Sequence, residues 1–418
     1  MEPNHTPNMN SFFAGIGGFD LGFENAGFKV SYICEINDYC NKVLDMHWPD
    51  VARGQDINEV QTKDIPKADV WCGGFPCQDI SVARGSLSRL GLNGARSGLF
   101  YRFAELIEAK KPEVVLIENV GGLFNSNKGH DLLVVLRTMS DLGYAVAWRL
   151  LNSRYFGVPQ SRPRVYICCW KKSPSAALRC MFNPAPNARL EGERKAFLAE
   201  STPAGQFPRV PTVGYCLAAT SGRHTGTDWS RTYATCDDGV RRLTPIECER
   251  LQGFPDNWTK ATNGYDPEES DSLRYAAIGN AVSVPVVQTI AERIAGILVE
   301  SPQKRALSEK ALAEYPVFAN TAWTDLPSDI DTPPEQKIVW PKAGLVWEGR
   351  FIAAKANTAP SAPVESSLFS IMQQGRMEDR YYLSPNAAEG ILRRVDNNQR
   401  HLFEPLREGL ERLSGRKA

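Results

Sequence analysis

Cys77 stands in a stretch whose composition restricts the backbone, WCGGFPCQDIS (residues 71–81). The apolar run before it indicates a strand, the Gly-Gly pair indicates a turn, and Pro76 fixes the backbone one residue before the thiol. A free cysteine has a pKa of about 8.5, yet the small thiolate fraction present near neutral pH is a strong nucleophile. The stretch fits a nucleophile held on a stiff loop, or else a packed, disulfide-bonded or metal-bound thiol.

Glu118, Arg162 and Arg164 offer chemistry that would complement a nucleophile. Glu118 ends an apolar run in the sequence ENV, where partial desolvation should let its carboxyl group hold a proton near neutrality. Arg162 and Arg164 alternate about a proline in QSRPR and can aim two donor forks at a phosphate or a base carbonyl. Taken singly, the acid could cap a helix and the arginines could be surface charges.

A glycine turn and two acids predict a binding site for an adenosyl group. The run SFFAGIGGF (residues 11–19) reads as a strand entering a turn, where glycines let the backbone approach a ligand closely. Glu35 lies 18 residues after Gly17, where an acid commonly holds ribose hydroxyls, and Asp56 can accept from an adenine amino group. A turn that merely needs glycine is the alternative. Because the full G-x-G-x-x-G is missing, an adenosyl ligand without pyrophosphate fits better than a nicotinamide dinucleotide.

These residues need a scaffold that brings strand ends together. Apolar runs near residues 30–34, 70–71, 113–117 and 165–168 predict strands, and helical spacing predicts a helix that includes Leu99, Phe103, Leu106 and Ile107. Unbroken apolar strands separated by helices indicate an α/β fold with a doubly wound parallel sheet covered on both faces. Ligands bind at the carboxyl ends of such strands, so we expect the candidate residues to converge there.

Composition and charge limit the class of protein. The 418 residues, with 42% hydrophobic and 23% charged, are typical of a globular protein of more than one domain. No run reaches 18 apolar residues and the first residues lack a signal peptide, so we expect a cytoplasmic protein without a membrane partner. The ten cysteines contain no C-x-x-C and the histidines no ligand spacing, which predicts neither disulfides nor a metal site. Residues 151–250 hold 15 Lys and Arg against 8 Asp and Glu, which suits a polyanion contact on one face.

The pattern along the chain predicts four parts. Residues 171–240 are loop-rich, regularity returns at the capping box Thr244-Pro245-Ile246-Glu247, and an apolar helix follows from about 284 to 299. Beyond 300, TAPSAPVESS reads as a Pro/Ser linker before two helices, one opening at Ser384-Pro385 and one near 402–413. We therefore expect a catalytic domain (10–170 and 274–300), a target-recognition domain (171–273), a linker region (301–367) and a small helical extension (368–418).

Together these motifs resemble the DNA (cytosine-5) methyltransferases. The similarity lies in ordered blocks that cover roughly residues 11–170 and 241–299: FFAGIGGFDLGFENAGF, CEIN, GQDI, GGFPCQDIS, RSGLF, ENV, GVPQSRPRVY, LTPIECERLQGFPDNW and IGNAVSVPV. The combination of PCQ, ENV and Q-x-R-x-R is specific to that family. The resemblance implies a Rossmann-like S-adenosyl-L-methionine-dependent methyltransferase domain beside a smaller target-recognition domain.

The resemblance also implies roles for single residues. Cys77 would attack C6 of a flipped-out cytosine in double-stranded DNA, Glu118 would hold or protonate the ring at N3, Arg164 would bind the base carbonyl, and Arg162 would steady the loop or a phosphate. The segment 84–99 would close over the base. The positions matching the family's binding site for S-adenosyl-L-methionine are Phe13, Gly15, Gly17, Glu35, Asp56, Ile57, Leu99 and Asn280.

Partners follow from the same resemblance, and so do alternatives. We expect a monomer on DNA, with a cognate restriction endonuclease as a partner. The alternatives are a tRNA cytosine-5 methyltransferase, an inactive DNA-binding relative, and a nicotinamide-dependent oxidoreductase. Ser11 stands where an acid is common in the family, and the region 171–240 matches no pattern that names a target sequence. The tail from 301 has no counterpart in the family pattern and is predicted to be dispensable, although RYYLSPNAAEGILRR resembles segments of phage-borne modification enzymes.

Overall fold

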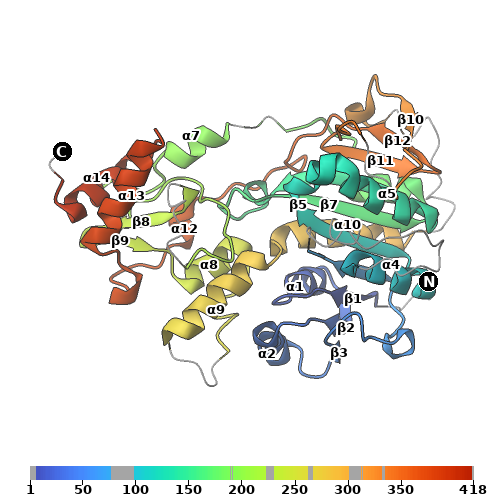
Figure 1. The fold of residues 1–418 in the computed structure, drawn as a ribbon, viewed down its shortest axis with the longest axis horizontal. Coiled ribbons are helices and arrows are strands. Elements are labelled where there is room, and N and C mark those ends of the chain that lie inside the picture. The colour runs from blue at the N-terminus through green and yellow to red at the C-terminus, as the bar shows by residue number, and fades with distance from the viewer. Residues whose placement is uncertain are drawn as a thin grey trace.

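The structure, a computed structural model, places two lobes side by side (Figure 1). It describes residues 6–76, 98–188, 190, 192–222, 230–261, 267–300, 312, 314–331 and 335–416. One lobe contains a large twisted sheet with helices on both faces. The other lobe is built around a small hairpin and the last helices of the chain.

Within the described residues the large sheet has ten strands in the order β10-β12-β11-β6-β7-β5-β4-β1-β2-β3. Five parallel strands form one side: β1 (Asn8–Phe12), β2 (Lys29–Cys34), β3 (Ala52–Gly54), β4 (Val70–Gly73) and β5 (Val114–Val120). β7 (Pro163–Lys171) pairs antiparallel with β5, and β6 (Tyr144–Asn152) pairs antiparallel with β7. The doubly wound α/β prediction is confirmed, with an antiparallel extension that the sequence pattern did not reveal.

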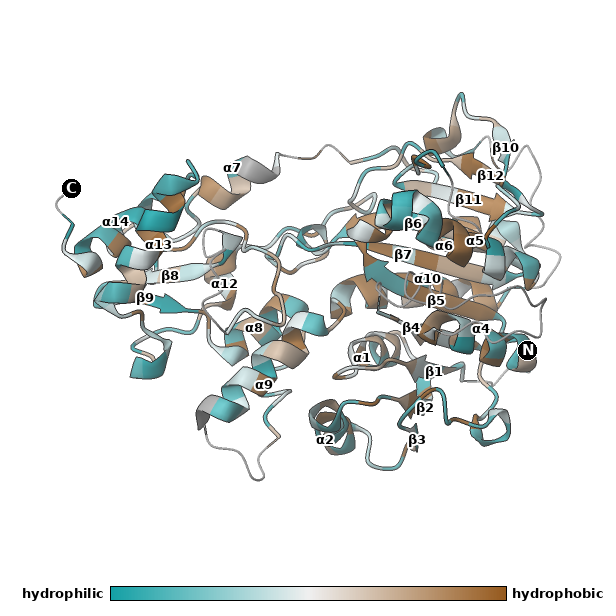
Figure 2. Cartoon of the chain, in the orientation of Figure 1, coloured by the Kyte–Doolittle hydropathy of each residue, from teal (hydrophilic) through white to brown (hydrophobic). Residues whose placement is uncertain are grey.

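Helices bury both faces of the sheet because its strands are apolar on both sides. Along β5, Val114 and Leu116 belong to one core cluster, whereas Val115 and Ile117 belong to the other. The first cluster packs under α1 (Gly18–Asn25), α2 (Asp38–His47), α6 (Pro174–Met181) and α10 (Val284–Leu298), and the second under α4 (Leu99–Lys110) and α5 (His130–Asp141). Figure 2 shows the strands of the sheet mainly in the colour of hydrophobic residues.

The second lobe contains the antiparallel hairpin of β8 (Tyr233–Cys236) and β9 (Gly239–Arg242). Around it lie α7 (Glu193–Leu198), α12 (Leu368–Ile371), α13 (Pro385–Asn397) and α14 (Glu404–Ser414). Between the lobes, α8 (Pro245–Gln252) begins at the predicted capping box, which is present, and α9 (Pro267–Asn280) leads back to α10. The smaller lobe therefore combines residues from the predicted target-recognition region with residues from the tail.

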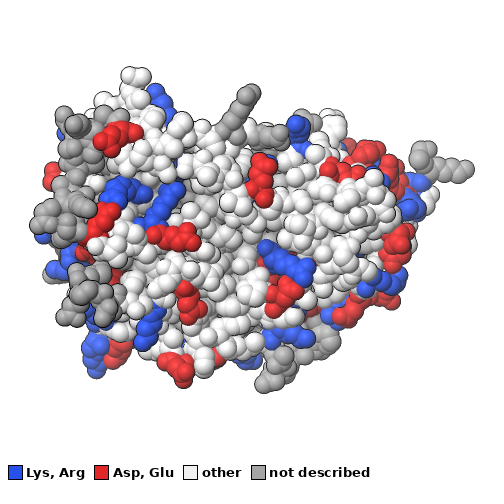
Figure 3. Space-filling view, turned by 180° about the vertical axis from the view of Figure 1, so that it is seen from behind, with Lys and Arg blue, Asp and Glu red and all other residues white. Residues whose placement is uncertain are grey.

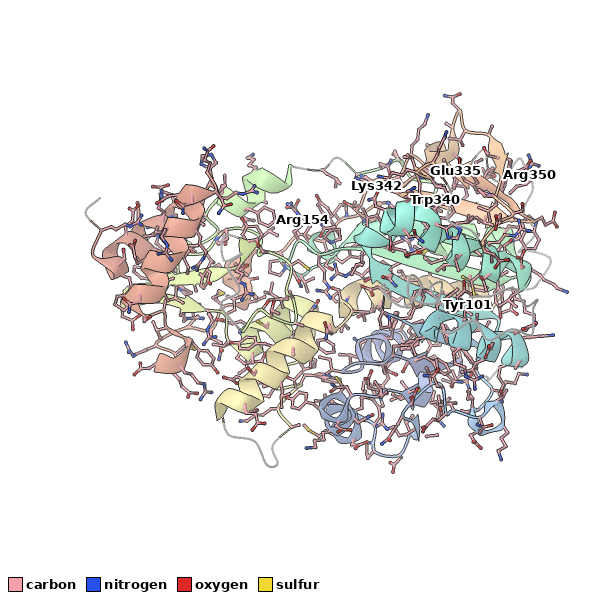
Figure 4. The ribbon with its side chains drawn as sticks, viewed as in Figure 1. Tyr101, Arg154, Glu335, Trp340, Lys342 and Arg350 are labelled. Carbon is pink, nitrogen blue, oxygen red and sulfur yellow. The ribbon has the colours of Figure 1, made fainter. Side chains whose placement is uncertain are left out.

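The prediction that residues 301–367 form a linker is wrong for much of that range. β11 (Ala343–Trp347) pairs with β6, β12 (Arg350–Ala353) pairs with β11, and β10 (Trp323–Asp325) pairs with β12. Trp340 packs edge-on against Trp148, and its indole N–H donates to the Gly129 carbonyl at the start of α5 over 2.6 Å. Figure 4 shows Trp340 and Lys342 beside α5. The tail is part of the large sheet.

Several arginines of the predicted basic region, residues 151–250, form ion pairs with acidic side chains. Figure 3 shows Lys and Arg interspersed with Asp and Glu on the face opposite to that of Figure 1. Among the described residues, five arginines of residues 151–250 pair with carboxylates, namely Arg164 with Glu118, Arg179 with Glu300, Arg209 with Glu200, Arg241 with Glu247, and Arg250 with Asp256. The local excess of positive charge therefore does not translate directly into a basic patch.

Among the described residues, no single helix is both long enough and apolar enough to span a membrane. Only the bent pair 269–280 and 284–298, taken together, passes a test of length and apolarity.

Ser11, which stands where the resembled family commonly has an acid, contacts a buried acid below the glycine turn. Its hydroxyl donates to Asp20 Oδ1 over 2.6 Å, which joins β1 to α1. Asp20 has no exposed surface, and burial raises its pKa to about 7, an effect that the Ser11 hydrogen bond partly offsets. The side chain is therefore a neutral carboxylic acid over most of the acidic range.

The tail's pairing with β6 leads us to expect that a chain ending at residue 305 is strongly destabilised. Such a truncation leaves the edge of β6 unpaired and uncovers Trp148, which is fully buried. Thermal unfolding should show a melting temperature lower by at least about 5 °C. A truncated chain that melts with the full-length protein would contradict the integration of the tail.

The buried acid predicts a pH dependence of stability. Because the folded-state pKa of Asp20 lies above its unfolded value of 3.8, its contribution is fully present below about pH 4 and is lost as pH rises through about 7. Asp20→Asn should therefore gain stability relative to wild type across that window, by up to about 1.4 kcal/mol per pH unit. Urea unfolding at several pH values measures the difference, and a difference independent of pH would contradict the assignment.

Candidate active site

A single cavity of about 570 Å³ opens at the carboxyl ends of the parallel strands. Phe12 of β1 is in register with Cys34 of β2 and Gly73 of β4, and Gly73 is in register with Ile117 of β5. Strands β1 to β4 thus end level, and the residues that follow them line the same cavity as Glu118, Asn119 and Val120 at the end of β5. The expected convergence at this edge of the sheet is observed, and the volume lies in the usual range for ligand sites.

The glycine turn is fastened to Glu35. The N–H of Gly15 donates to Glu35 Oε2 over 2.7 Å, and the N–H of Asn37 donates to Oε1 over 2.8 Å. Phe13 has a φ of 55°, which is unusual for a residue with a side chain, and its ring lies edge-on to Phe103. The carboxylate and the turn therefore form one rigid wall of the cavity.

The other predicted cofactor residues fall on the same cavity, with one exception. Asp56, Ile57, Leu99 and Asn280 all line it, and Arg102 of α4 donates to the Ile57 carbonyl over 3.2 Å. Gly17 is not among the described residues of the lining. A Cβ at Gly17 would collide with the ring of Trp48, and the backbone there has a φ of 83°. The predicted contact between Gly17 and a cofactor is not supported, because this glycine shapes the turn from beneath.

Glu118 and Arg164 lie together at the β5–β7 side of the cavity. Arg164 Nε is 3.2 Å from Glu118 Oε1, and the two residues lie on adjacent antiparallel strands. Burial raises the pKa of Glu118, and the charges of Arg164 and Arg162 offset part of that shift. The next residue, Asn119, donates through its side-chain amide to the Phe75 carbonyl over 3.0 Å, which fixes the segment just before Pro76.

Arg162 is buried and binds the backbone of two distant segments. Its Nη1 donates to the Leu217 carbonyl over 2.8 Å, and its Nη2 donates to the carbonyls of Gly279 over 3.0 Å and Ala281 over 2.8 Å. Burial lowers its pKa, and the nearby Arg164 adds to that effect. The sequence predicted that Arg162 would steady either the loop or a phosphate. The first role fits this geometry, because the terminal nitrogens of Arg162 already donate to protein carbonyls.

Cys77, the predicted nucleophile, lies outside the described residues, as does most of the predicted closing segment, of which residues 98 and 99 are described. Pro76, immediately before Cys77, lines the cavity.

Several lining residues were not anticipated from the sequence. Ile36 is 67% exposed although it is large and apolar, and it lines the cavity directly after Glu35. Tyr39, Asn119 and Ala277 also line it. Cys216 lies just behind, with its sulfur 3.4 Å from Arg162 Nη1 and 3.8 Å from Arg164 Nη2. An apolar residue directly after the acid was the sequence signal available for Ile36, whereas Cys216 had none because its neighbourhood is made by distant segments.

The strand order, and a cavity that joins the glycine turn fastened by Glu35 to the buried carboxyl group of Glu118, define an α/β fold with a ligand site at its strand ends. A solved structure of Entamoeba histolytica methyltransferase EhMeth shares this fold, with a TM-score of 0.50 and 17% identity over 71% of this chain and 100% of that one.

The family follows from sequence comparison. Residues 8–202 and 203–296 match the model of the C-5 cytosine-specific DNA methylase family. The type II methyltransferase M2.BsuMI of Bacillus subtilis is 32% identical over 68% of this chain and 74% of its own length, and M.HhaI of Haemophilus parahaemolyticus is 31% identical over 69% and 94%. The chain belongs to this family. It is a DNA cytosine-5 methyltransferase that uses S-adenosyl-L-methionine and acts on double-stranded DNA.

Proposed function

We propose that one cavity holds the methyl donor and a flipped-out cytosine side by side. The donor would lie against the ends of β1, β2 and β3, and the base against the ends of β5 and β7. The observation that carries this division is that Glu35 and Glu118 line the same cavity from its two sides. Because C6 of cytosine is inaccessible in a stacked duplex, the base must leave the helix, at a cost of a few kcal/mol.

On the donor side, Glu35 would orient the ribose. Both carboxylate oxygens already accept backbone N–H groups, and each retains a further lone pair for a hydroxyl donor. Asp56 would accept from the adenine amino group, while Phe13, Ile57 and Leu99 supply apolar surface and Gly15 lets the backbone approach. Asn280 would close the rim. When bound, S-adenosyl-L-methionine supplies an electrophilic methyl group.

On the base side, Glu118 would protonate or hold N3 and the exocyclic amino group. A carboxyl group whose pKa is raised by burial can donate a proton, and Arg164 beside it can bind the base carbonyl. Cys77 would add its sulfur to C6, which makes C5 nucleophilic. After C5 takes the methyl group, loss of the C5 proton to a base restores the ring double bond and expels the Cys77 thiolate. Arg162 is a positioning residue in this scheme.

Partners and setting remain proposals. The relatives' naming as type II methyltransferases supports a modification enzyme with a cognate restriction endonuclease. We further propose a cytoplasmic enzyme that acts as a monomer on DNA. A phage origin for the tail stays a prediction.

The direct test is nucleoside mass spectrometry after incubation of unmethylated duplex DNA, or tRNA, with the protein and S-adenosyl-L-methionine. We expect 5-methylcytosine in DNA and none in tRNA, and sequencing the same DNA would give the target sequence. Methylation of tRNA alone would overturn the assignment.

Glu118→Gln should lower kcat by about 10²–10⁴-fold, because the amide can hold N3 but cannot protonate it. The raised pKa of Glu118 means that wild-type kcat falls as pH rises through that value, since the protonated form is the one required. The variant's residual rate should lack this fall. Glu108→Gln, on the exposed side of α4, is the control. An unchanged pH profile in the Glu118 variant would refute the acid role.

Cys77→Ala should abolish methyl transfer while leaving the Kd for S-adenosyl-L-methionine near the wild-type value. The reason is that the thiol acts on the base, whereas the cofactor contacts come from other strands. Tritium transfer and equilibrium dialysis measure the two quantities, and retained turnover would exclude Cys77 as the nucleophile.

A further inference from the structure

The last part of the tail lies beyond the family match, which ends at residue 296, yet it returns to the smaller lobe. In Figure 1, α13 and α14 lie against β8 and β9, far from the tail strands β10–β12. The N–H of Leu383 donates to the Val240 carbonyl over 2.8 Å, and Tyr382 forms a bridge with Arg241. The tail thus adds a short paired segment to the free edge of β9.

One face of the hairpin shares a core with the two tail helices. Tyr233 and Val240 of the hairpin belong to the same buried cluster as Ile391 and Leu410 of α13 and α14. The approach is close at Gly409 of α14, where a Cβ would lie 2.7 Å from Thr235 Cγ2 and 2.9 Å from Val240 Cγ2. The backbone of α14 therefore rests directly on the hairpin.

The opposite face of the hairpin is tied to α8 and again to the tail. Arg241 and Glu247 form a fully buried pair with two hydrogen bonds of 2.8 Å. Glu247 Oε1 also accepts the N–H of Gln373 over 2.9 Å, and the Thr244 hydroxyl donates to Gln373 Oε1 over 2.5 Å. Hairpin, tail and the first turn of α8 are thereby held as one unit.

The far end of α8 reaches the active site. Gln160 donates to the Leu251 carbonyl over 3.0 Å, and Gln252 donates to the Ala281 carbonyl over 3.3 Å. The same Ala281 carbonyl accepts from Arg162, which lines the cavity. Helix α8 therefore connects the tail segment at Gln373, bonded to its first turn, with the active-site wall, bonded to its last turn.

We propose that α13 and α14 are a working part of the target-recognition unit, and that they position the β8–β9 hairpin and α8 relative to the base-binding cavity. Gly409 is a positioning residue for this contact. The tail, which lies beyond the matched family region, would then help decide which DNA is methylated efficiently. This inference rests on DNA being the substrate.

Gly409→Leu tests the proposal in the full-length enzyme, because the new side chain must push α14 away from the hairpin. Gly390→Leu is a matched control: a Cβ there meets only the end of the Arg394 side chain, at 3.2 Å. We expect Gly409→Leu to raise the KM for DNA carrying the target sequence by about tenfold or more, the size of one mismatched base pair. It should also reduce the preference over DNA with a single mismatch. The control should change neither quantity, and both variants should keep the Kd for S-adenosyl-L-methionine.

The outcomes separate cleanly. One outcome is a Gly409→Leu enzyme that melts at a lower temperature yet keeps the wild-type KM for target DNA and the wild-type preference over mismatched DNA. That result would show that α13 and α14 only stabilise the lobe, and it would overturn the proposal. If that variant loses cofactor binding, the milder Gly409→Ala is judged by the same criteria. A wild-type enzyme that fails to methylate any duplex would instead refute the substrate assignment.

Discussion

The two lobes meet around the buried guanidinium of Arg162. Its terminal nitrogens hold the carbonyls of Leu217, Gly279 and Ala281, so the segment that precedes β7 is fixed to the smaller lobe and to the turn between α9 and α10. Removing this side chain would leave three buried carbonyls with a lost donor, which costs more than the hydrogen bonds themselves contribute. The position of Arg164 two residues later, and hence of the β5–β7 side of the cavity, depends on this contact.

With Arg162 holding the lobes together, the grouping of the site residues follows from neighbouring strands that end in register. Parallel pairing places the residues after β1, β2, β3 and β4, together with the end of β5, along one edge of the sheet, so Glu35 and Glu118 share a cavity. Their environments differ. Both residues are buried, but Glu35 accepts two backbone N–H groups, whereas Glu118 lies beside Arg164, and burial raises the pKa of Glu118. In the proposed mechanism, one edge of the sheet thus provides a hydrogen-bond acceptor for the methyl donor and an acid for the base.

Local patterns predicted the parts of the structure that are local. The strands at 29–34 and 114–120, the capping box at Thr244, and Glu35, Asp56 and Glu118 were all visible as apolar runs or as acids after strands. The tail strands were not, because β11 is five residues long and its partner β6 lies about two hundred residues earlier. Likewise, no periodicity signals that Arg162 binds distant carbonyls, or that Gly409 is small because a hairpin lies beneath it. These features depend on packing between segments far apart in the chain, which local secondary-structure propensity does not encode.

The most direct test of the account is covalent trapping on duplex DNA that carries 5-fluorocytosine in the target sequence, in the presence of S-adenosyl-L-methionine. Fluorine at C5 cannot leave as a proton does, so the enzyme–base adduct persists and its position can be found by peptide mass spectrometry. The account predicts a single adduct on the peptide that contains Cys77. An adduct on Cys216, the thiol beside Arg162 and Arg164, or methylation without any trapped adduct, would contradict it.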